Sequence, residues 1–180
     1  MQYELVNEYE ISAETSKQLN ELLIASFPET EYARRDYFKQ LPHYRIIARE
    51  NGQVIGQLGI DFRAMNLNGE AVNIFGVIDL CVHLKYRKQG IAKQLMLKME
   101  STAQANSQKV DFLFLVADDS EFYEKLGFEK VIITTQWLKI NQHINYGLGH
   151  EKIEDVSFMI KPISGKKWAS GELDYLGYMY

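Results

Sequence analysis

The sequence predicts an α/β fold with a mixed central sheet, antiparallel strands in its N-terminal part, and flanking helices. Two dipeptides, Asn51-Gly52 and Asn68-Gly69, each separate two strand-like runs, and Asn-Gly accommodates the positive φ angles of tight hairpin turns. The next run, residues 72–84, is apolar on both alternating faces, as in a central strand that is covered on each side. Helical and extended patterns alternate after it, an order typical of α/β proteins.

The segment before the hairpins predicts one strand and two helices. Residues 2–9 have the pattern of a strand, and Ser12 is placed to cap a helix that buries Leu19, Leu22 and Leu23. That helix ends at Pro28. Residues 29–42 predict a short second helix that ends before Pro42.

The segment after residue 84 predicts a helix at 93–106, a strand at 109–117, a helix at 119–126 and a strand from 128. We expect Asp118 and Glu121 to form a capping box and Gly127 to end the second helix in the left-handed conformation. Residues 141–155 contain two glycines and mixed charge, which predicts a loop. Residues 163–180 form an aromatic, acidic tail that we expect to fold back, because exposing so much aromatic area is unfavourable.

Length and composition bound the class of protein. A chain of 180 residues that is 46% hydrophobic is long enough for one domain, and we predict a single domain over residues 1–180. One cysteine excludes an internal disulfide and suits a reducing, cytoplasmic compartment. The net charge of −4 argues against a nucleic-acid partner. The sequence has neither a signal-like start nor a membrane-length apolar run, so we expect no membrane partner.

A basic, glycine-bearing turn joins the central strand to the first helix after it. Gly90 permits close approach of a ligand to the backbone, and the first helical turn presents unpaired N–H groups at the positive end of the helix dipole. Four cations surround this turn, and together these features predict a site for a phosphate-bearing ligand. The cations are Lys85, Arg87, Lys88 and Lys93. The alternative is an ordinary strand–turn–helix connection whose lysines are only solvated.

Two motifs resemble the GNAT superfamily of N-acetyltransferases. The run Arg87-Lys88-Gln89-Gly90-Ile91-Ala92 resembles its Arg/Gln-x-x-Gly-x-Gly/Ala signature, and Tyr123, Gly127 and Phe128 resemble the Tyr-x-x-x-Gly-Phe ending of its second acetyl-CoA segment. The resemblance implies a GNAT-like fold, acetyl-CoA as cosubstrate and a tail on the acceptor side. It also implies that the cofactor is bound by Leu80, Cys81, Val82, Arg87, Lys88, Gln89, Gly90, Ile91, Ala92 and Ser120.

Two residues are catalytic candidates. Asp79 interrupts an apolar face, where desolvation would raise the pKa of its carboxyl group and suit it to accept a proton; the alternative is a structural, hydrogen-bonded carboxylate. Tyr123 matches the tyrosine that many family members place near the thioester sulfur, where a phenol protonates the leaving thiolate; the alternative is a packing tyrosine on an amphipathic helix. Cys81 is interpreted as a small buried hydrophobe and not as a nucleophile. The histidines lack metal-ligand spacing, so we predict no metal site.

The acceptor is predicted to be a small cationic molecule with a primary amine, such as an amino sugar, an aminoglycoside or a polyamine. Acidic and aromatic groups in the second helix and the tail favour it, and the predicted substrate-binding residues are Tyr32, Asp174, Tyr178 and Tyr180. The layout also resembles the branch of aminoglycoside 2'-N-acetyltransferases and nodulation acyltransferases. The alternatives are a non-catalytic CoA-binding sensor or interaction module, and an acyltransferase acting on a protein amine. A homodimer is compatible with the sequence.

Overall fold

The computed structural model describes residues 1–28, 41–141 and 144–179. The chain divides into two compact units. Unit 1 contains residues 1–61 and 77–101, and unit 2 contains residues 62–76 and 102–180. Each unit has its own buried core. The helix predicted for residues 29–42 falls almost entirely outside the described residues.

Unit 1 is built on four strands, in the order β1-β2-β3-β4. They are β1 (Gln2–Asn7), β2 (Tyr44–Glu50), and the parts within unit 1 of β3 (Gln53–Leu67) and β4 (Glu70–Val82). β1 pairs antiparallel with β2, and β2 pairs antiparallel with β3. Asn51 and Gly52 both have positive φ, 49° and 80°, as predicted for the hairpin turn between β2 and β3.

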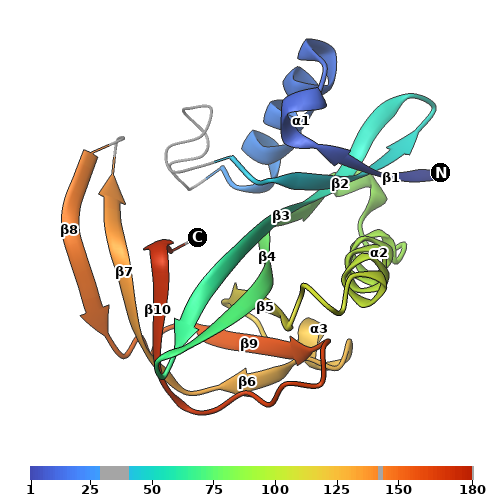
Figure 1. Ribbon diagram of the computed structural model, residues 1–180. Helices are drawn as coiled ribbons and strands as arrows, with labels where there is room; N and C mark the ends of the chain where they lie inside the picture. Colours follow the sequence, from blue (N-terminus) through green and yellow to red (C-terminus); the bar gives the residue numbers. More distant parts are fainter. Residues whose placement is uncertain (29–40, 142–143, 180) are drawn as a thin grey trace. The chain divides into compact units, whose positions relative to one another are not determined.

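Two helices cover opposite faces of these strands (Figure 1). α1 (Ala13–Ser26) begins at Ser12, whose hydroxyl accepts a hydrogen bond from the Thr15 N–H at 3.2 Å, as predicted. Its three leucines pack against apolar side chains of β2, β3 and β4. α2 (Ile91–Ala105) lies on the other face, where a Cβ at Gly56 would come within 3.2 Å of Ile91. The absence of a side chain at Gly56 therefore lets α2 pack close to β3.

Unit 2 contains the remaining parts of β3 and β4 and six further strands. The strand order is β6-β9-β5-β4-β3-β10-β7-β8, and the sheet is mixed. β5 pairs parallel with β4, and β10 pairs parallel with β7, whereas the pairs β10–β3, β5–β9, β6–β9 and β7–β8 are antiparallel. The predicted mixed α/β sheet is confirmed. The strands first met here are β5 (Phe112–Ala117), β6 (Glu129–Val131), β7 (Ile133–Asn141), β8 (Ile144–Glu151), β9 (Ser157–Pro162) and β10 (Gly171–Tyr178).

The prediction of a loop at residues 141–155 is wrong for most of its length. β7 extends to Asn141, and residues 144–151 form β8, which pairs antiparallel with it. The two glycines of this segment hide the alternating pattern of a strand in the sequence. The packing of a neighbouring side chain requires glycine at position 149. A Cβ there would lie 2.5 Å from the ring of Trp137, its partner across the ladder, so only glycine leaves room for the indole.

The C-terminal tail supplies β10, which lies between β3 and β7. Tyr175 is fully buried and meets Phe114 edge-on, with ring centroids 5.8 Å apart. It belongs to a core that also contains Met65, Leu67, Val72, Ile74, Phe112, Phe114, Ile133, Phe158, Ile160 and Leu173. The tail is therefore part of the packing of unit 2.

We expect Tyr175→Ala to destabilise the protein by about 3–5 kcal/mol, because it removes a large ring from a close-packed core. Leu176→Ala is the matched control, since Leu176 is 62% exposed and its loss should cost less than about 0.5 kcal/mol. Urea unfolding followed by tryptophan fluorescence measures both. Equal midpoints for the two variants would show that the tail is not a core element.

Candidate active site

The basic turn between β4 and α2 is held by hydrogen bonds of its own residues. A short 3-10 helix, η3 (Leu84–Tyr86), follows His83, whose Nδ1 accepts from the Lys85 N–H at 3.3 Å. The Arg87 Nε donates to the Val82 carbonyl at 3.1 Å. Lys88 and Gly90 have positive φ, 62° and 80°. The backbone therefore reverses sharply and enters α2 in a defined conformation.

The start of α2 has the electrostatics of an anion site. Gly90 lies in open space, since a Cβ there would meet no atom within 4 Å. The first helical hydrogen bond joins the Gln94 N–H to the Gly90 carbonyl at 3.0 Å, so the N–H groups before Gln94 point out of the helix end. The first turn carries no acidic residue to neutralise it. The four predicted cations around it are all exposed: Lys85, Arg87, Lys88 and Lys93.

Asp79 occupies an irregular position within β4. Its φ is 49°, in the left-handed region, which interrupts the two-residue alternation of a regular strand. The carbonyl of Asp79 accepts a hydrogen bond from Gln57 Nε2. Gln57 in turn accepts from Arg45 Nη1 at 2.8 Å. The two-face pattern expected for residues 72–84 therefore does not continue past Asp79, and this residue is partly exposed.

Tyr123 lies on α3 (Glu121–Glu124), the short helix of unit 2. Its ring is edge-on to Phe122 and Phe128, with centroids 5.0 and 6.0 Å away. Burial, and then the charges of Asp118 and Asp119, raise the pKa of Tyr123 to about 12. The phenol therefore keeps its proton well above neutral pH, as a proton donor must.

The start of α3 differs from the predicted capping box. The N-cap residue is Ser120, whose side chain makes no capping hydrogen bond, and the Glu121 N–H donates to the carboxylate of Asp119 at 3.0 Å and not to Asp118. Ser120, a predicted cofactor ligand, donates its hydroxyl to Glu124 at 2.9 Å. Gly127 has φ of 82° and ends the helical segment as predicted.

Cys81 is buried beside α1, in the core of unit 1. Burial raises the pKa of its thiol to about 11, against smaller opposing effects of hydrogen bonds with Ser26 and Gln57. A protonated thiol is a weak nucleophile. The interpretation of Cys81 as a small buried hydrophobe agrees with this environment.

The predicted acceptor residues are only partly described, since Tyr32 and Tyr180 lie outside the described residues. Asp174 accepts hydrogen bonds on both carboxylate oxygens, from Gln136 Nε2 at 2.7 Å and from the Leu176 N–H at 2.8 Å. Tyr178 is buried, and the guanidinium of Arg63 lies 4.3 Å from the centre of its ring. Both side chains thus have partners within unit 2.

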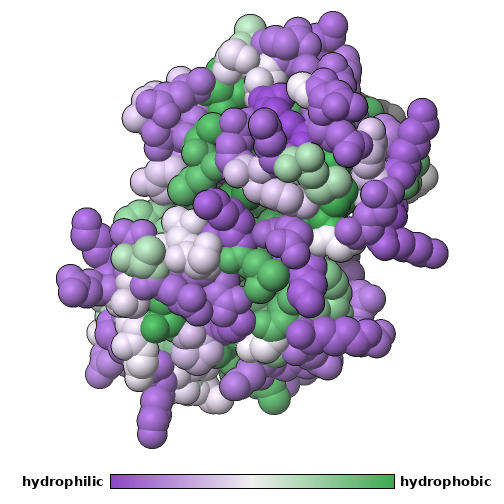
Figure 2. Space-filling view, turned by 90° about the vertical axis from the view of Figure 1, so that its right-hand side faces the viewer, coloured by the Kyte–Doolittle hydropathy of each residue, from purple (hydrophilic) through white to green (hydrophobic). Residues whose placement is uncertain are grey.

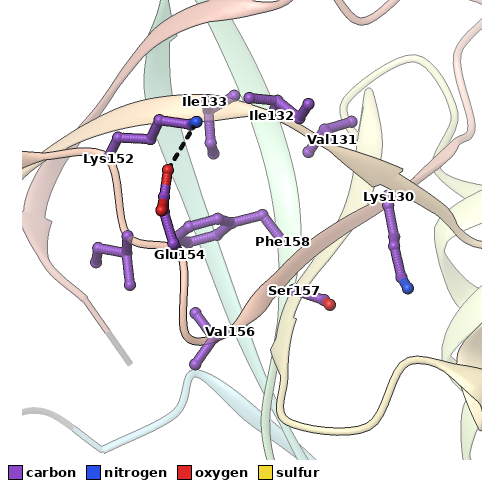
Figure 3. Close-up of a pocket in the computed structure, with 10 residues that line it drawn as sticks. Lys130, Val131, Ile132, Ile133, Lys152, Glu154, Val156, Ser157 and Phe158 are labelled. Atoms are coloured by element: carbon purple, nitrogen blue, oxygen red, sulfur yellow. Dashed lines mark hydrogen bonds and ion pairs between the residues drawn. The ribbon is translucent and has the colours of Figure 1, made fainter.

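A pocket of 240 Å³ lies elsewhere in unit 2 (Figure 3). Its lining is mostly aliphatic, and the Phe158 ring faces an ion pair between Lys152 Nζ and Glu154 Oε1, 2.9 Å apart. The lining residues are Lys130, Val131, Ile132, Ile133, Lys152, Ile153, Glu154, Val156, Ser157 and Phe158. No residue predicted from the motifs lines it, so this pocket is separate from the predicted cofactor site.

Two residues that the sequence did not single out lie together in unit 1. The Nδ1 of His43 is 2.9 Å from Oδ1 of Asp61, at the end where β2 begins beside β3. The Asp61 side chain is 1% exposed and the His43 side chain is 42% exposed. The register of the first hairpin brings them together.

Charged and polar side chains cover most of the face in Figure 2, and apolar ones lie in separate patches between them. In the part of the chain that the structure describes, no helix has the length and apolar character needed to cross a membrane. In the same residues, no group of three His, Cys, Asp or Glu side chains gathers as a metal site requires.

Comparison with known proteins agrees with the fold and the motifs. The family model described as "Acetyltransferase (GNAT) domain" matches residues 9–131, more than half of the chain. The chain therefore belongs to the GNAT family of acetyltransferases. It is accordingly an acyltransferase.

Three solved structures match over most of both chains. The GNAT family N-acetyltransferase YhbS from Escherichia coli, in complex with CoA, is 21% identical, with a TM-score of 0.65, over 97% of this chain and 88% of that one. A GNAT family acetyltransferase from Brucella melitensis, in complex with acetyl-CoA, is 16% identical, with a TM-score of 0.59 and coverages of 97% and 96%. The ribosomal-protein-S18-alanine N-acetyltransferase from Escherichia coli is 15% identical, with a TM-score of 0.56 and coverages of 92% and 97%. At these identities the likeness is one of fold.

We expect the Cys81 thiol to be almost inert in the folded protein. At pH 8, alkylation by iodoacetamide should be roughly two orders of magnitude slower than in urea, because few molecules carry a thiolate when its pKa is raised. Cys81→Ala should retain acetyl transfer. Fast labelling of the native protein, or a folded Cys81→Ala variant without activity, would restore the nucleophile hypothesis.

Proposed function

We propose that this protein is an acetyl-CoA-dependent N-acetyltransferase that transfers the acetyl group directly to a primary amine. The observation that carries the proposal is the basic turn at residues 85–93, which ends at the start of α2, where Gly90 lies in open space and the first turn has no acidic residue. A pyrophosphate bound there would meet outward N–H groups, the positive end of the helix dipole and four cations. Because the chain belongs to the GNAT family, we expect the pyrophosphate to be that of acetyl-CoA.

The residues present fit a CoA molecule along β4 and the turn. β4 pairs with β5 from Ile74 to Gly76 and then continues to Val82, and this supports pairing of its later peptide groups with the amides of pantetheine. The Val82 carbonyl accepts from Arg87, and we propose that peptide groups of Leu80, Cys81 and Val82 bind the pantetheine arm. Two related folds were crystallised with CoA or acetyl-CoA.

The transfer needs a neutral amine, and the departing thiolate needs a proton. We assign proton donation to Tyr123 on its match to the family motif, since its phenol carries a proton at neutral pH. Asp79 is the carboxylate that we predicted to accept the amine proton, directly or through water. The left-handed backbone at this position turns its side chain out of the regular strand pattern.

We propose that the acceptor is a small cationic molecule. This part of the proposal rests on the excess of acidic over basic residues in the chain. The chain carries 24 acidic and 20 basic residues, and several of the basic ones gather at the cofactor turn. A cationic amine is therefore attracted to the remaining surface. Amino sugars, aminoglycosides and polyamines are the classes to test, and the free thiol suits a cytoplasmic setting.

Purified protein, acetyl-CoA and a panel of amines test the proposal, with released thiol and acetylated product both measured. The panel contains an aminoglycoside, glucosamine, spermidine and a peptide with a free N-terminus. Transfer to one of the first three supports a small cationic acceptor, whereas transfer only to the peptide indicates a protein amine. Tight acetyl-CoA binding without any product indicates a binding module and overturns the enzymatic proposal.

Gly90→Asp should raise the Kd for acetyl-CoA by more than about tenfold, which corresponds to about 1.4 kcal/mol, because it puts a negative charge where phosphate binds. Gly69→Asp is the matched control. Gly69 also has positive φ, 92°, and open space around it, so the backbone strain is similar and the position is remote in sequence from the turn. Calorimetry measures both. If folded Gly90→Asp binds as tightly as the parent, the phosphate site is elsewhere.

Tyr123→Phe should lower kcat by roughly a hundredfold or more, the usual contribution of a positioned acid. The Kd for acetyl-CoA should change little, because the ring and its packing remain. Tyr146→Phe serves as control, since Tyr146 is exposed on β8. Single-turnover assays report the chemical step, and an unchanged rate constant would remove Tyr123 from the mechanism.

A further inference from the structure

Gln57 carries a buried side-chain amide whose two ends have different partners within unit 1. The residue lies on β3 and is fully buried. Its Oε1 accepts a hydrogen bond from Arg45 Nη1 at 2.8 Å, and its Nε2 donates to the carbonyl of Asp79 on β4. Gln57 lies opposite Ile47 in the β2–β3 ladder, and Ile47 belongs to the core that α1 covers. Opposite residues of a ladder share a face, so the Gln57 amide is on the α1 face of the strands.

Arg45 determines which way round this amide lies. A guanidinium only donates hydrogen bonds, so it selects the oxygen end of the amide as its partner. A flipped amide would bring its NH2 group against the cation and its oxygen against the Asp79 carbonyl, and both contacts are repulsive. Glu8 holds Arg45 in turn, since its carboxylate accepts from Nε at 2.7 Å and from Nη2 at 3.0 Å. The Nε2 donor of Gln57 is therefore directed at the Asp79 carbonyl.

The hydrogen bond at the Asp79 carbonyl also orients the next N–H group of β4. The peptide bond between Asp79 and Leu80 is trans, so its N–H points in the direction opposite to its carbonyl. Because the carbonyl is held by Gln57, the Leu80 N–H is aimed away from the Gln57 amide. The same contact fixes the backbone from which the Asp79 side chain extends.

The backbone conformation of Asp79 needs a contact of this kind. Its φ of 49° lies in the left-handed region, which is unfavourable for a residue with a side chain. In a regular strand the Asp79 carbonyl would take another direction, and the Leu80 N–H would turn with it. The buried Nε2 of Gln57 would then lose a strong acceptor and keep a weak one, the Sγ of Cys81 at 3.8 Å. Gln57 therefore favours the irregular form of β4 over the regular one.

We propose that Gln57 is a positioning residue of the transferase, which holds β4 in the conformation that binds the pantetheine arm of acetyl-CoA. The inference rests on the proposed function and assigns a residue that lies outside both motifs. Through the Asp79 carbonyl, Gln57 aims the Leu80 N–H at an acceptor atom of the arm and fixes the place from which the Asp79 carboxylate takes the amine proton. The pyrophosphate end does not depend on Gln57, since the turn at residues 85–93 is held by its own hydrogen bonds.

The test compares acetyl-CoA with ADP, which has the pyrophosphate of CoA but lacks the pantetheine arm. Gln57→Glu keeps the side-chain volume and an oxygen for Arg45, but it places a second oxygen against the Asp79 carbonyl. We expect the Kd for acetyl-CoA to rise by about threefold to tenfold, the usual effect of one lost hydrogen bond, and the Kd for ADP to change by less than about twofold. With the acceptor found for the parent, kcat should fall by about tenfold or more, because the Asp79 carboxylate is displaced. Gly90→Asp, in contrast, should weaken the binding of both ligands.

Gln57→Leu is the second variant, because it removes the amide without adding a charge. It should give the same difference between acetyl-CoA and ADP. Gln18→Glu is the matched control, since the Gln18 Oε1 accepts from the Val54 N–H at 2.9 Å and the substitution makes the same chemical change in another amide that binds the backbone of unit 1. It should retain both Kd values and kcat. Thermal unfolding establishes that each variant is folded.

An NMR titration of the unaltered protein tests the Leu80 N–H directly, because its amide signal should shift more with acetyl-CoA than with ADP. An unmoved Leu80 signal, unchanged Kd and kcat in folded Gln57 variants, or an equal loss of affinity for both ligands would overturn the proposal. Failure of both variants to fold would also overturn it, since Gln57 would then serve the fold alone. A parent that binds acetyl-CoA but transfers to no amine overturns the proposed function, and the Kd values still decide whether Gln57 positions the arm site.

Discussion

The buried amide of Gln57 is the interaction on which the arrangement of unit 1 depends. Its side chain is fully buried, accepts from Arg45 on β2 and donates to the carbonyl of Asp79 on β4, while Gln57 itself belongs to β3. Arg45 is also enclosed, and its guanidinium donates to Glu8 at 2.7 and 3.0 Å. A chain of polar contacts therefore joins three strands and the segment after β1. Losing any member would leave a buried charge or amide unsatisfied, which is costly.

This polar chain explains how an irregular residue persists in a central strand. A left-handed conformation is unfavourable for a residue with a side chain, so something must compensate for it at Asp79. The Gln57 amide does so by satisfying the carbonyl that the irregularity turns out of the ladder. The hydrogen bond from Gln57 that holds the backbone of Asp79 therefore also fixes the position of the Asp79 Cα, from which the side chain extends.

Features determined by local chemistry could be predicted from the sequence. The Asn-Gly turns, the Ser12 cap and the basic turn each depend on residues a few positions apart, and all are present. The His43–Asp61 pair could not be predicted in this way. A regular hairpin around Asn51-Gly52 would place His43 opposite Ile60, but a bulge between Ala48 and Arg49 shifts the register by one residue. β8 escaped prediction because Gly149 is needed by the distant ring of Trp137.

The side chain of Asn68, in the tip of the β3–β4 hairpin, also has a consequence for the order of folding. Its Oδ1 accepts from the Glu172 N–H at 2.8 Å, and its Nδ2 donates to the Ser170 carbonyl at 3.2 Å, across about a hundred residues of chain. Contacts of such separation form slowly. Unit 1 ends at Ser101, whereas unit 2 needs β10 near the C-terminus. Unit 1 can therefore fold during synthesis, before unit 2, which must wait until the residues of β10 have been synthesised.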